Sequence, residues 1–394
     1  MLTGCVDEFE AELPSEDTRI LVVEGRIQSD HDVDFLLSWS TPLYSDLGTH
    51  YHWDRDTHSS YQYTDVDYVS GAKVKVCGTD GSEYVCKEYN LSYGGSGRYT
   101  CKLPKLKRDV AYYLYIKLGD DVYQSVPEKP VPTPEIEDFS CIQRDPESDI
   151  DVMVSTAAPE DPNQVNYFLW DYSDTWEIRP RLYSYVYFDI YNLECVFKSI
   201  YPQRGWKFGE NKDILVEATV HYDGGKLAKH KLYSIPRTDE RIFWYYHSSL
   251  IQQAISKAEY EYHMAVRQAG WEMGGLFTPQ PSTLPGNIRC MTSDKRTIGY
   301  VGCSWNTATC NLLLDCSTIS REIKKPNEVK VETNPEMAQC LDMVKLQHKL
   351  VYMWDDKRDY GDKLTVYWAD DVDIDIRLEG ASTKKPPYMP PFDE

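Results

Sequence analysis

Short apolar runs separated by turn residues dominate the first third of the chain. Residues 72–77 alternate polar and apolar side chains, which predicts a strand with one buried face. Asp80 and Gly81 then form a hairpin signal, and residues 83–86 return as a second strand. Further strands are predicted at 19–27, 35–40, 98–101 and 112–116. Five to seven short strands with turns between them predict an Ig-like or transthyretin-like β-sandwich.

Four prolines follow this sandwich and predict a stiff linker: Pro127, Pro130, Pro132 and Pro134. We therefore expect a tether at residues 1–17, a sandwich domain at 18–132 and a larger β-rich domain at 133–394. Strand-like patterns in this second part lie at 150–154, 167–170, 214–220, 363–368 and 373–377. The predicted fold class is mainly β.

One helix is predicted in the second domain. Ser256 is a candidate N-cap, and Glu259 three residues later completes a capping box. The pattern continues to Gly270, which is a plausible residue to follow a helix end. The preceding residues 248–255 are a second helical candidate. We therefore expect one or two helices, in an insertion near 248–270.

Cys5 is the most informative single residue. It ends the sequence Leu2-Thr3-Gly4-Cys5, which matches the end of a bacterial lipoprotein signal, so we expect its thiol to carry lipid. The charged and apolar regions of the signal peptide are expected to have been removed ahead of it. The alternative is a buried or free cysteine near the start of the chain.

Acidic residues at 7–12 lie directly beside this anchor. They resemble the export signal of Bacteroidota lipoproteins, which implies the outer membrane and the cell surface; a plain solvated tether is the alternative. No run approaches the ~18 to 20 apolar residues of a spanning helix. The net charge of −21 argues against nucleic acid as a partner, because phosphates are bound by Lys and Arg.

Ten cysteines remain besides Cys5, and in an exported protein an even number suggests disulfides. Cys77 and Cys86 flank the Asp80-Gly81 turn and could pair across the hairpin, with Cys101 as a competing partner. A second group is formed by Cys303, Cys310, Cys316 and Cys340. The connectivity cannot be deduced from spacing.

Candidate ligand-binding residues gather between two predicted strands, at His50, His52, Trp53, Asp54, Asp56 and His58. Alternating imidazoles and carboxylates suit a transition metal, although a polar surface loop or a contact surface for a partner explains them as well. Asp371, Asp373 and Asp375 alternate on a predicted strand and could hold calcium, or form the charged solvent face of an edge strand.

Catalytic motifs find little support in this sequence. It contains no Gly-x-Ser-x-Gly, no His-Glu-x-x-His and no P-loop pattern. We therefore expect no enzyme and no cofactor. Distant carboxylate pairs leave a hydrolase as a less favoured alternative.

Several segments together resemble a family of Bacteroidota outer-membrane lipoproteins known as domain of unknown function 4249. They are residues 70–74, 97–99, 122–125, 161–177, 259–262, 275–277, 285–288, 298–301, 375–377 and 380–388. Members usually carry a cysteine in the last motif, whereas this chain has none after Cys340, so a terminal disulfide is in doubt.

The resemblance implies a location and a neighbourhood, with no catalytic residues to carry over. Such lipoproteins look like partners of TonB-dependent outer-membrane transporters. We therefore expect a cell-surface accessory or substrate-binding protein in nutrient uptake. A free-standing glycan- or metal-binding surface protein is the alternative.

Overall fold

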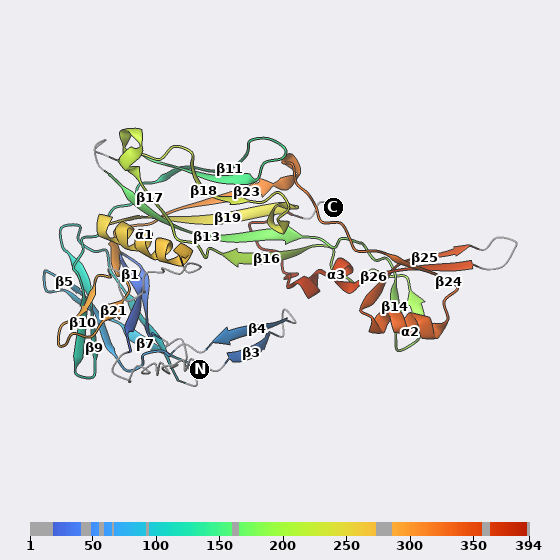
Figure 1. Ribbon diagram of the computed structural model, residues 1–394, viewed down its shortest axis with the longest axis horizontal. Coiled ribbons are helices and arrows are strands. Elements are labelled where there is room, and N and C mark those ends of the chain that lie inside the picture. Colours follow the sequence, from blue (N-terminus) through green and yellow to red (C-terminus); the bar gives the residue numbers. More distant parts are fainter. Residues whose placement is uncertain are drawn as a thin grey trace, which may run out of the picture.

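Three β-rich units follow one another along an elongated molecule (Figure 1). The computed structural model describes residues 19–40, 49–54, 59–64, 67–91, 94–159, 165–272, 286–356 and 363–391. The predicted mainly β class is confirmed. None of the helices within these ranges is long and apolar enough to cross a membrane.

The first unit is a sandwich of two sheets. One sheet has the order β21-β1-β2-β8-β7, with β22 also beside β1: Leu21–Gln28 (β1), Asp32–Trp39 (β2), Lys87–Leu91 (β7), Gly94–Lys102 (β8), Thr297–Ile298 (β21) and Gly302–Ser304 (β22). The other has the order β20-β10-β9-β5-β6: Lys73–Gly78 (β5), Glu83–Val85 (β6), Tyr112–Leu118 (β9), Asp121–Ser125 (β10) and Ile288–Cys290 (β20). The predicted strands are confirmed, and the two sheets share one core.

Alternation along the strands builds this first core. Val74 and Val76 of β5, and Leu114 and Ile116 of β9, are each at most 1% exposed. Burying such a side chain contributes roughly 1.5–3 kcal/mol. Because successive side chains point to opposite faces, one face of each sheet is apolar and the two faces pack together.

Strands β20 to β22 reach the sandwich from far along the sequence. The expected boundary near residue 133 assigns them to the second domain, yet they pair with β10 and β1. They satisfy backbone groups that an edge strand would leave unpaired. Gly299 lies so close to β1 that a Cβ atom would be 2.0 Å from the Val23 carbonyl oxygen, so only glycine fits. The boundary stays a prediction; the pairing shows that the sandwich includes these later strands.

The central unit contains two more sheets around a second core. One has the order β11-β12-β18: Ile136–Gln143 (β11), Ile150–Thr156 (β12) and His230–Ile235 (β18). The other has the order β16-β13-β19-β23, with β17 also on β13: Tyr167–Ile178 (β13), Gly205–Glu210 (β16), Leu215–Ala218 (β17), Tyr245–Ile255 (β19) and Ala308–Asp315 (β23). Trp170, Trp206 and Tyr246 are almost fully buried here.

Residues 248–255 are part of strand β19, so the helical prediction for them is wrong. Their buried positions alternate, but Ser248 and Gln252 occupy two of them, which hides the period of two in the sequence. Gln252 is satisfied because it accepts from Trp170 Nε1 at 2.9 Å and donates to the Pro134 carbonyl at 2.8 Å. Hydrogen bonding makes these polar positions compatible with a central strand.

Helix α1 spans Lys257–Glu272 and confirms the predicted helix and its N-cap. The Ser256 hydroxyl accepts from the Glu259 backbone N–H at 3.2 Å. Gly270 lies inside the helix and not after it, which corrects the predicted end.

The C-terminal unit is small and has its own core around Trp368. Its elements are β14 (Tyr187–Asp189), β15 (Glu194–Val196), β24 (Lys330–Thr333), α2 (Met337–Lys345), β25 (His348–Asp356), β26 (Lys363–Asp370) and α3 (Asp371–Ile374). A separate hairpin consists of β3 (Thr49–Asp54) and β4 (Ser59–Thr64). Single 3-10 turns lie at Thr219–His221 (η2), Asp223–Gly225 (η3), Glu240–Ile242 (η4), Cys316–Thr318 (η6) and Ile376–Glu379 (η7).

Residues 373–374 belong to α3 and residues 376–377 to η7, with Asp375 as the cap between them, so the predicted strand there is wrong. Asp375 accepts hydrogen bonds from the backbone N–H and the guanidinium of Arg377. Such a side-chain cap favours a helical turn. The alternation of Asp and Ile therefore arises from a cap beside buried residues and not from a sheet.

The ten cysteines of the described residues are all thiols in this structure. The predicted group near the C-terminus is dispersed: Cys303 belongs to the first core, Cys310 and Cys316 to the second, and Cys340 to the third. Closeness in sequence does not bring these four together.

Candidate functional site

The predicted histidine- and aspartate-rich segment lies on the β3–β4 hairpin. His50 and His52 are at alternate positions of β3, paired with Tyr63 and Tyr61 of β4, and Trp53 and Asp54 complete the strand. Asp56 and His58, like the lipidation candidate Cys5, lie outside the described residues. A metal or a partner at this hairpin stays a prediction.

The three C-terminal aspartates do not share one site. Asp373 is buried and accepts from Arg181 Nη1 at 2.9 Å and from the Asn327 backbone N–H at 2.8 Å. Asp375 is instead held by Arg377. Asp371 begins helix α3. Across the described ranges, no group of three or more His, Cys, Asp or Glu side chains comes together as a metal site.

A pocket of about 330 Å³ opens where the central unit meets the C-terminal unit. Strand β13 ends in it at Ile178, and Pro180 prevents the strand from continuing. Its other lining residues come from the segment after β13, from η4 and the two residues after it, from the segment after η6 and from η7: Arg179, Arg181, Tyr183, Glu240, Phe243, Trp244, Ile323, Lys324, Lys325, Pro326 and Glu379.

Arg179 forms one wall of this pocket. Its guanidinium lies 4.0 Å from the centre of the Trp244 ring, a cation–π contact. Its Nε donates to Glu177 Oε1 at 2.6 Å. Glu177 is fully buried and also binds Arg204, so its charge is compensated on two sides. These contacts hold the Arg179 plane in a fixed orientation at the pocket wall.

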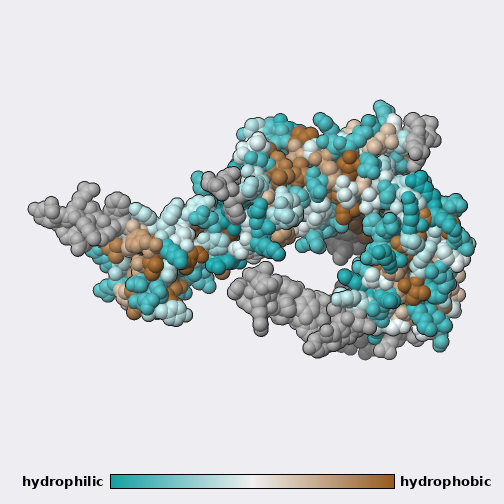
Figure 2. All heavy atoms as spheres, turned by 180° about the vertical axis from the view of Figure 1, so that it is seen from behind, coloured by the Kyte–Doolittle hydropathy of each residue, from teal (hydrophilic) through white to brown (hydrophobic). Residues whose placement is uncertain are grey.

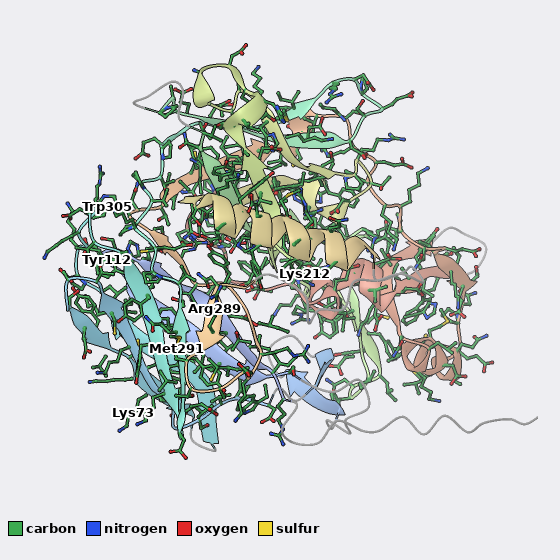
Figure 3. All side chains as sticks on the ribbon, turned by 60° about the vertical axis from the view of Figure 1, so that its left-hand side comes forward. Lys73, Tyr112, Lys212, Arg289, Met291 and Trp305 are labelled. Carbon is green, nitrogen blue, oxygen red and sulfur yellow. The ribbon has the colours of Figure 1, made fainter. Side chains whose placement is uncertain are left out.

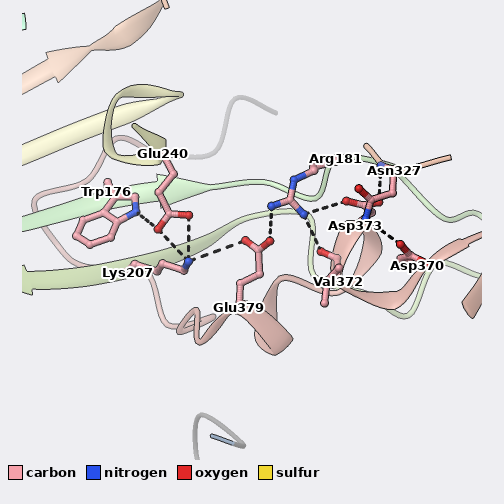
Figure 4. Close-up of polar contacts among 9 residues, drawn as sticks. All are labelled: Trp176, Arg181, Lys207, Glu240, Asn327, Asp370, Val372, Asp373 and Glu379. Atoms are coloured by element: carbon pink, nitrogen blue, oxygen red, sulfur yellow. Dashed lines mark hydrogen bonds and ion pairs between the residues drawn. The ribbon is translucent and has the colours of Figure 1, made fainter. Parts of the chain in front are cut away.

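Arg181 connects the pocket to the C-terminal unit (Figure 4). Besides Asp373, it binds the Glu379 carboxylate and donates to the Val372 carbonyl at 3.3 Å. Burial opposes its charge, but Glu379 and Asp373 raise the pKa of Arg181 overall. The guanidinium is therefore a fixed positive centre.

Lys207 extends this network into the central sheets. Its Nζ lies 2.9 Å from Glu240 Oε1 and 3.9 Å from Glu379 Oε2 (Figure 4). Trp176 Nε1 donates to the same Glu240 oxygen at 3.3 Å. Positive and negative side chains thus alternate along a network that connects the central sheets to η7 and α3. Three of its members, Arg181, Glu240 and Glu379, line the pocket and are held in place by these contacts.

Two further cations give the pocket its net charge. Lys324 and Lys325 are exposed, and neither has an ion pair with any residue that the structure describes. The lining carries four basic and two acidic side chains, on a protein of net charge −21. Together with Tyr183, Phe243 and Trp244, this arrangement suits an anionic ligand with a flat or apolar face.

No motif in the sequence predicted this pocket. Its residues come from four distant stretches, so no local spacing predicts them. Two weak signals were present in the acidic chain: Arg179-Pro180-Arg181 and Lys324-Lys325-Pro326.

An apolar surface lies beside the pocket, on residues 183–200 around β14 and β15. Tyr191 is 91% exposed, Phe197 68% and Tyr185 62%. Ile190, Leu193 and Ile200 are also exposed. The space-filling view shows apolar residues gathered on the C-terminal unit (Figure 2). We call residues 183–200 the apolar segment.

A buried ion pair joins the sandwich to helix α1 at the opposite end of the central unit. Arg26 of β1 binds both carboxylate oxygens of Glu259, which is 2% exposed. His263 Nε2 lies 3.6 Å from the same carboxylate. Burial lowers the pKa of Arg26 to about 10, and burial together with Arg26 lowers the pKa of His263 to about 4. Figure 3 shows β20, with Arg289, on the sandwich beneath α1.

Two of the motifs quoted above meet at this ion pair. A Cβ atom on Gly302 would lie 2.2 Å from the Glu259 carboxylate, and the Tyr262 and Tyr300 rings are 5.4 Å apart. Since Glu259 binds Arg26, its side chain serves this junction. These residues hold the units together.

The comparisons with known proteins identify one family. The model of the family described as "Domain of unknown function (DUF4249)" matches residues 6–309. This is more than half of the chain, so the chain belongs to the DUF4249 family. No curated protein matches the sequence.

Proposed function

We propose that this protein is a lipoprotein of the outer-membrane surface, anchored through Cys5, that acts as an accessory of a TonB-dependent transporter in nutrient uptake. The sequence around Cys5 and the resemblance to Bacteroidota lipoproteins support the location. The apolar segment and the neighbouring pocket support a role in binding, and we expect no catalysis.

The exposed apolar segment is the observation that carries the partnership. Monomeric proteins rarely leave large apolar patches in water, and such patches often mark interaction sites. Tyr185, Tyr191 and Phe197 belong to residue types that are enriched at protein interfaces. The segment is part of a unit with its own core, so it is presented on a stable support.

A native-membrane purification tests the partnership. The full chain is crosslinked in its own outer membrane, extracted in mild detergent and analysed by mass spectrometry for barrel proteins. We expect a transporter to accompany the natural chain and to be lost from Tyr191→Ser/Phe197→Ser. Val85→Ser is the matched control, because Val85 is 65% exposed but lies on the sandwich. Recovery of no barrel protein with the natural chain contradicts the proposal.

A free-standing glycan-binding protein is the second candidate, and the pocket favours it. Arg179, Lys324 and Lys325 beside Trp244 suit a sugar that carries carboxylates. Calorimetry of the purified chain with oligogalacturonate tests this directly. Binding in the absence of any transporter supports the second candidate, and no heat of binding removes it. The predicted metal site on the hairpin is tested in the same way. The natural chain and a variant with His50, His52 and His58 replaced are each titrated with divalent metals, and a metal site there requires binding that the variant loses.

A further inference from the structure

Two cysteine side chains meet inside the first core. Cys86 and Cys101 are each 6% exposed, and their Sγ atoms lie 2.9 Å apart. A disulfide requires about 2.05 Å between the sulfur atoms. A movement of about 1 Å therefore separates this pair from a covalent bond.

Strand register explains why these two cysteines meet. Lys87 of β7 pairs with Thr100 of β8, so continuing the antiparallel register by one residue places Cys86 opposite Cys101. Directly opposed residues have Cα separations that a disulfide can span. Tyr99 and Cys101 are buried on the same face of β8, toward the core.

Cys77 faces away from this pair, although it lies nearest to Cys86 in the predicted hairpin. Val74 and Val76 of β5 point into the core, so the next residue, Cys77, points to the opposite face. Its register partner on β6 is Glu83. The strand period therefore disfavours a Cys77–Cys86 link.

The position of Cys86 gives the pair a structural role. Its backbone N–H donates to the Val74 carbonyl at 2.9 Å, which ties it to the sheet of β5. Cys101 belongs to β8 of the other sheet, where it pairs with Val33 of β2. Because Cys86 lies between the edge strands β6 and β7, a bond between the two sulfur atoms would tie the two sheets together at this edge.

We propose that Cys86 and Cys101 form a disulfide in an oxidising compartment, and that this bond links the two sheets of the first sandwich. The oxidant is a low-molecular-weight or protein disulfide. This proposal is independent of any transporter or pocket ligand.

The reaction proceeds by two thiol–disulfide exchanges. The Cys101 thiolate attacks the oxidant disulfide, forms a mixed disulfide and releases one thiolate. Cys86 then loses its proton and attacks Cys101 Sγ, which releases the second thiolate. Two protein thiols are oxidised, one oxidant disulfide is reduced to two thiols, and both protons go to those thiols. Since both side chains are buried, the exchange precedes the final closure of the sandwich.

Peptide mapping tests the link. The purified full chain is refolded in oxidised and reduced glutathione, alkylated without reduction, and cut after Lys, Arg and Glu. This digestion separates Cys77 from Cys86 at Glu83, so that residues 84–87 and 99–102 are recovered as separate peptides. We expect these two peptides to be joined, with Cys77 alkylated. Recovery of Cys86 and Cys101 as alkylated thiols, or of Cys86 joined to Cys77, overturns the proposal.

Serine variants provide a second measurement. Cys101→Ser is expected to lower the midpoint of thermal unfolding of the oxidised protein by roughly 5 °C. After reduction, the midpoints of the natural protein and of Cys101→Ser should differ by less. Cys77→Ser is the matched control and should keep the 84–87/99–102 link. If the oxidised natural protein and oxidised Cys101→Ser both fold and unfold at the same temperature, the disulfide does not stabilise the sandwich and the proposal is contradicted.

Discussion

The central unit meets the sandwich through a closed junction and meets the C-terminal unit through an open one. In the first, Glu259 is 2% exposed and Arg26 15%. In the second, Arg181 is 18% exposed and binds Asp373, which is 1% exposed, and Glu379, which is 21% exposed where the pocket opens. Both junctions rely on an arginine and carboxylates.

Burial separates the two. A charge removed from water loses a large hydration energy and needs its partner, whereas a partly exposed charge such as Glu379 keeps part of its hydration. The closed junction is therefore suited to holding two units rigidly. The open junction leaves cations and aromatic rings available to a ligand. The same ion-pair chemistry thus serves assembly at one end and recognition at the other.

Arg26→Met is expected to have the largest effect. It leaves the buried Glu259 carboxylate without its guanidinium, which should lower the free energy of unfolding by about 3–5 kcal/mol. Urea denaturation measures this. Glu261→Gln is the control, because Glu261 is 61% exposed on the same helix and should change stability little. A loss below about 1 kcal/mol for Arg26→Met would show that the closed junction is not held by this pair.

The closed junction should also weaken in acid through His263. Folded His263 is protonated only near pH 4, whereas an unfolded histidine is protonated near 6.5. The unfolded state thus binds more protons between these values, so stability falls as the pH is lowered from 6.5 to 4. After a discount for the 21% exposure of the side chain, we expect about 2 kcal/mol.

The difference between the natural protein and His263→Gln measures this effect, since other acid groups titrate in both. Arg26, Glu259 and the Tyr262 ring lie next to His263, and Asp171 and Asp213 line the same pocket as its side chain. If the free energy of unfolding changes with pH in the same way for both proteins, protonation of His263 does not destabilise the folded state.

Arg181→Met tests the open junction and should cost less, about 1–2 kcal/mol. Asp373 loses its guanidinium but keeps the Asn327 N–H, and Glu379 keeps Lys207. Arg144→Met is the matched control, because Arg144 is 71% exposed where it binds Asp151. A loss as large as that of Arg26→Met would mean that the two junctions do not differ in the way burial predicts.

The smallest stability effect is expected for Lys324→Ala/Lys325→Ala, within about 0.5 kcal/mol. If the pocket binds an acidic sugar, the same variant should weaken oligogalacturonate binding roughly tenfold, and the difference should shrink in high salt. Calorimetry at two salt concentrations measures both. Unchanged affinity would show that these lysines do not face the ligand.

Local patterns predicted much of the fold and little of the site. Alternation predicted β5 and β9, and Ser256 predicted the start of α1. The same rule failed at β19, where Ser248 and Gln252 are buried among apolar neighbours. It also failed at residues 373–377, where the alternating pattern of a strand comes from an aspartate that caps a helical turn. The pocket was missed because its residues lie far apart along the chain.

The sequence by itself determined turns, caps and strand faces, because those interactions involve residues only a few positions apart. It placed Cys77 and Cys86 on either side of a hairpin turn, but only the packed core showed that Val76, and not Cys77, faces inward. Tertiary structure alone decided the partners. Arg26 and Glu259 are 233 residues apart, and Arg181 and Asp373 are 192 apart. Such pairs exist only once the sheets have packed, because a charge takes a specific partner when burial removes the water that would otherwise solvate it.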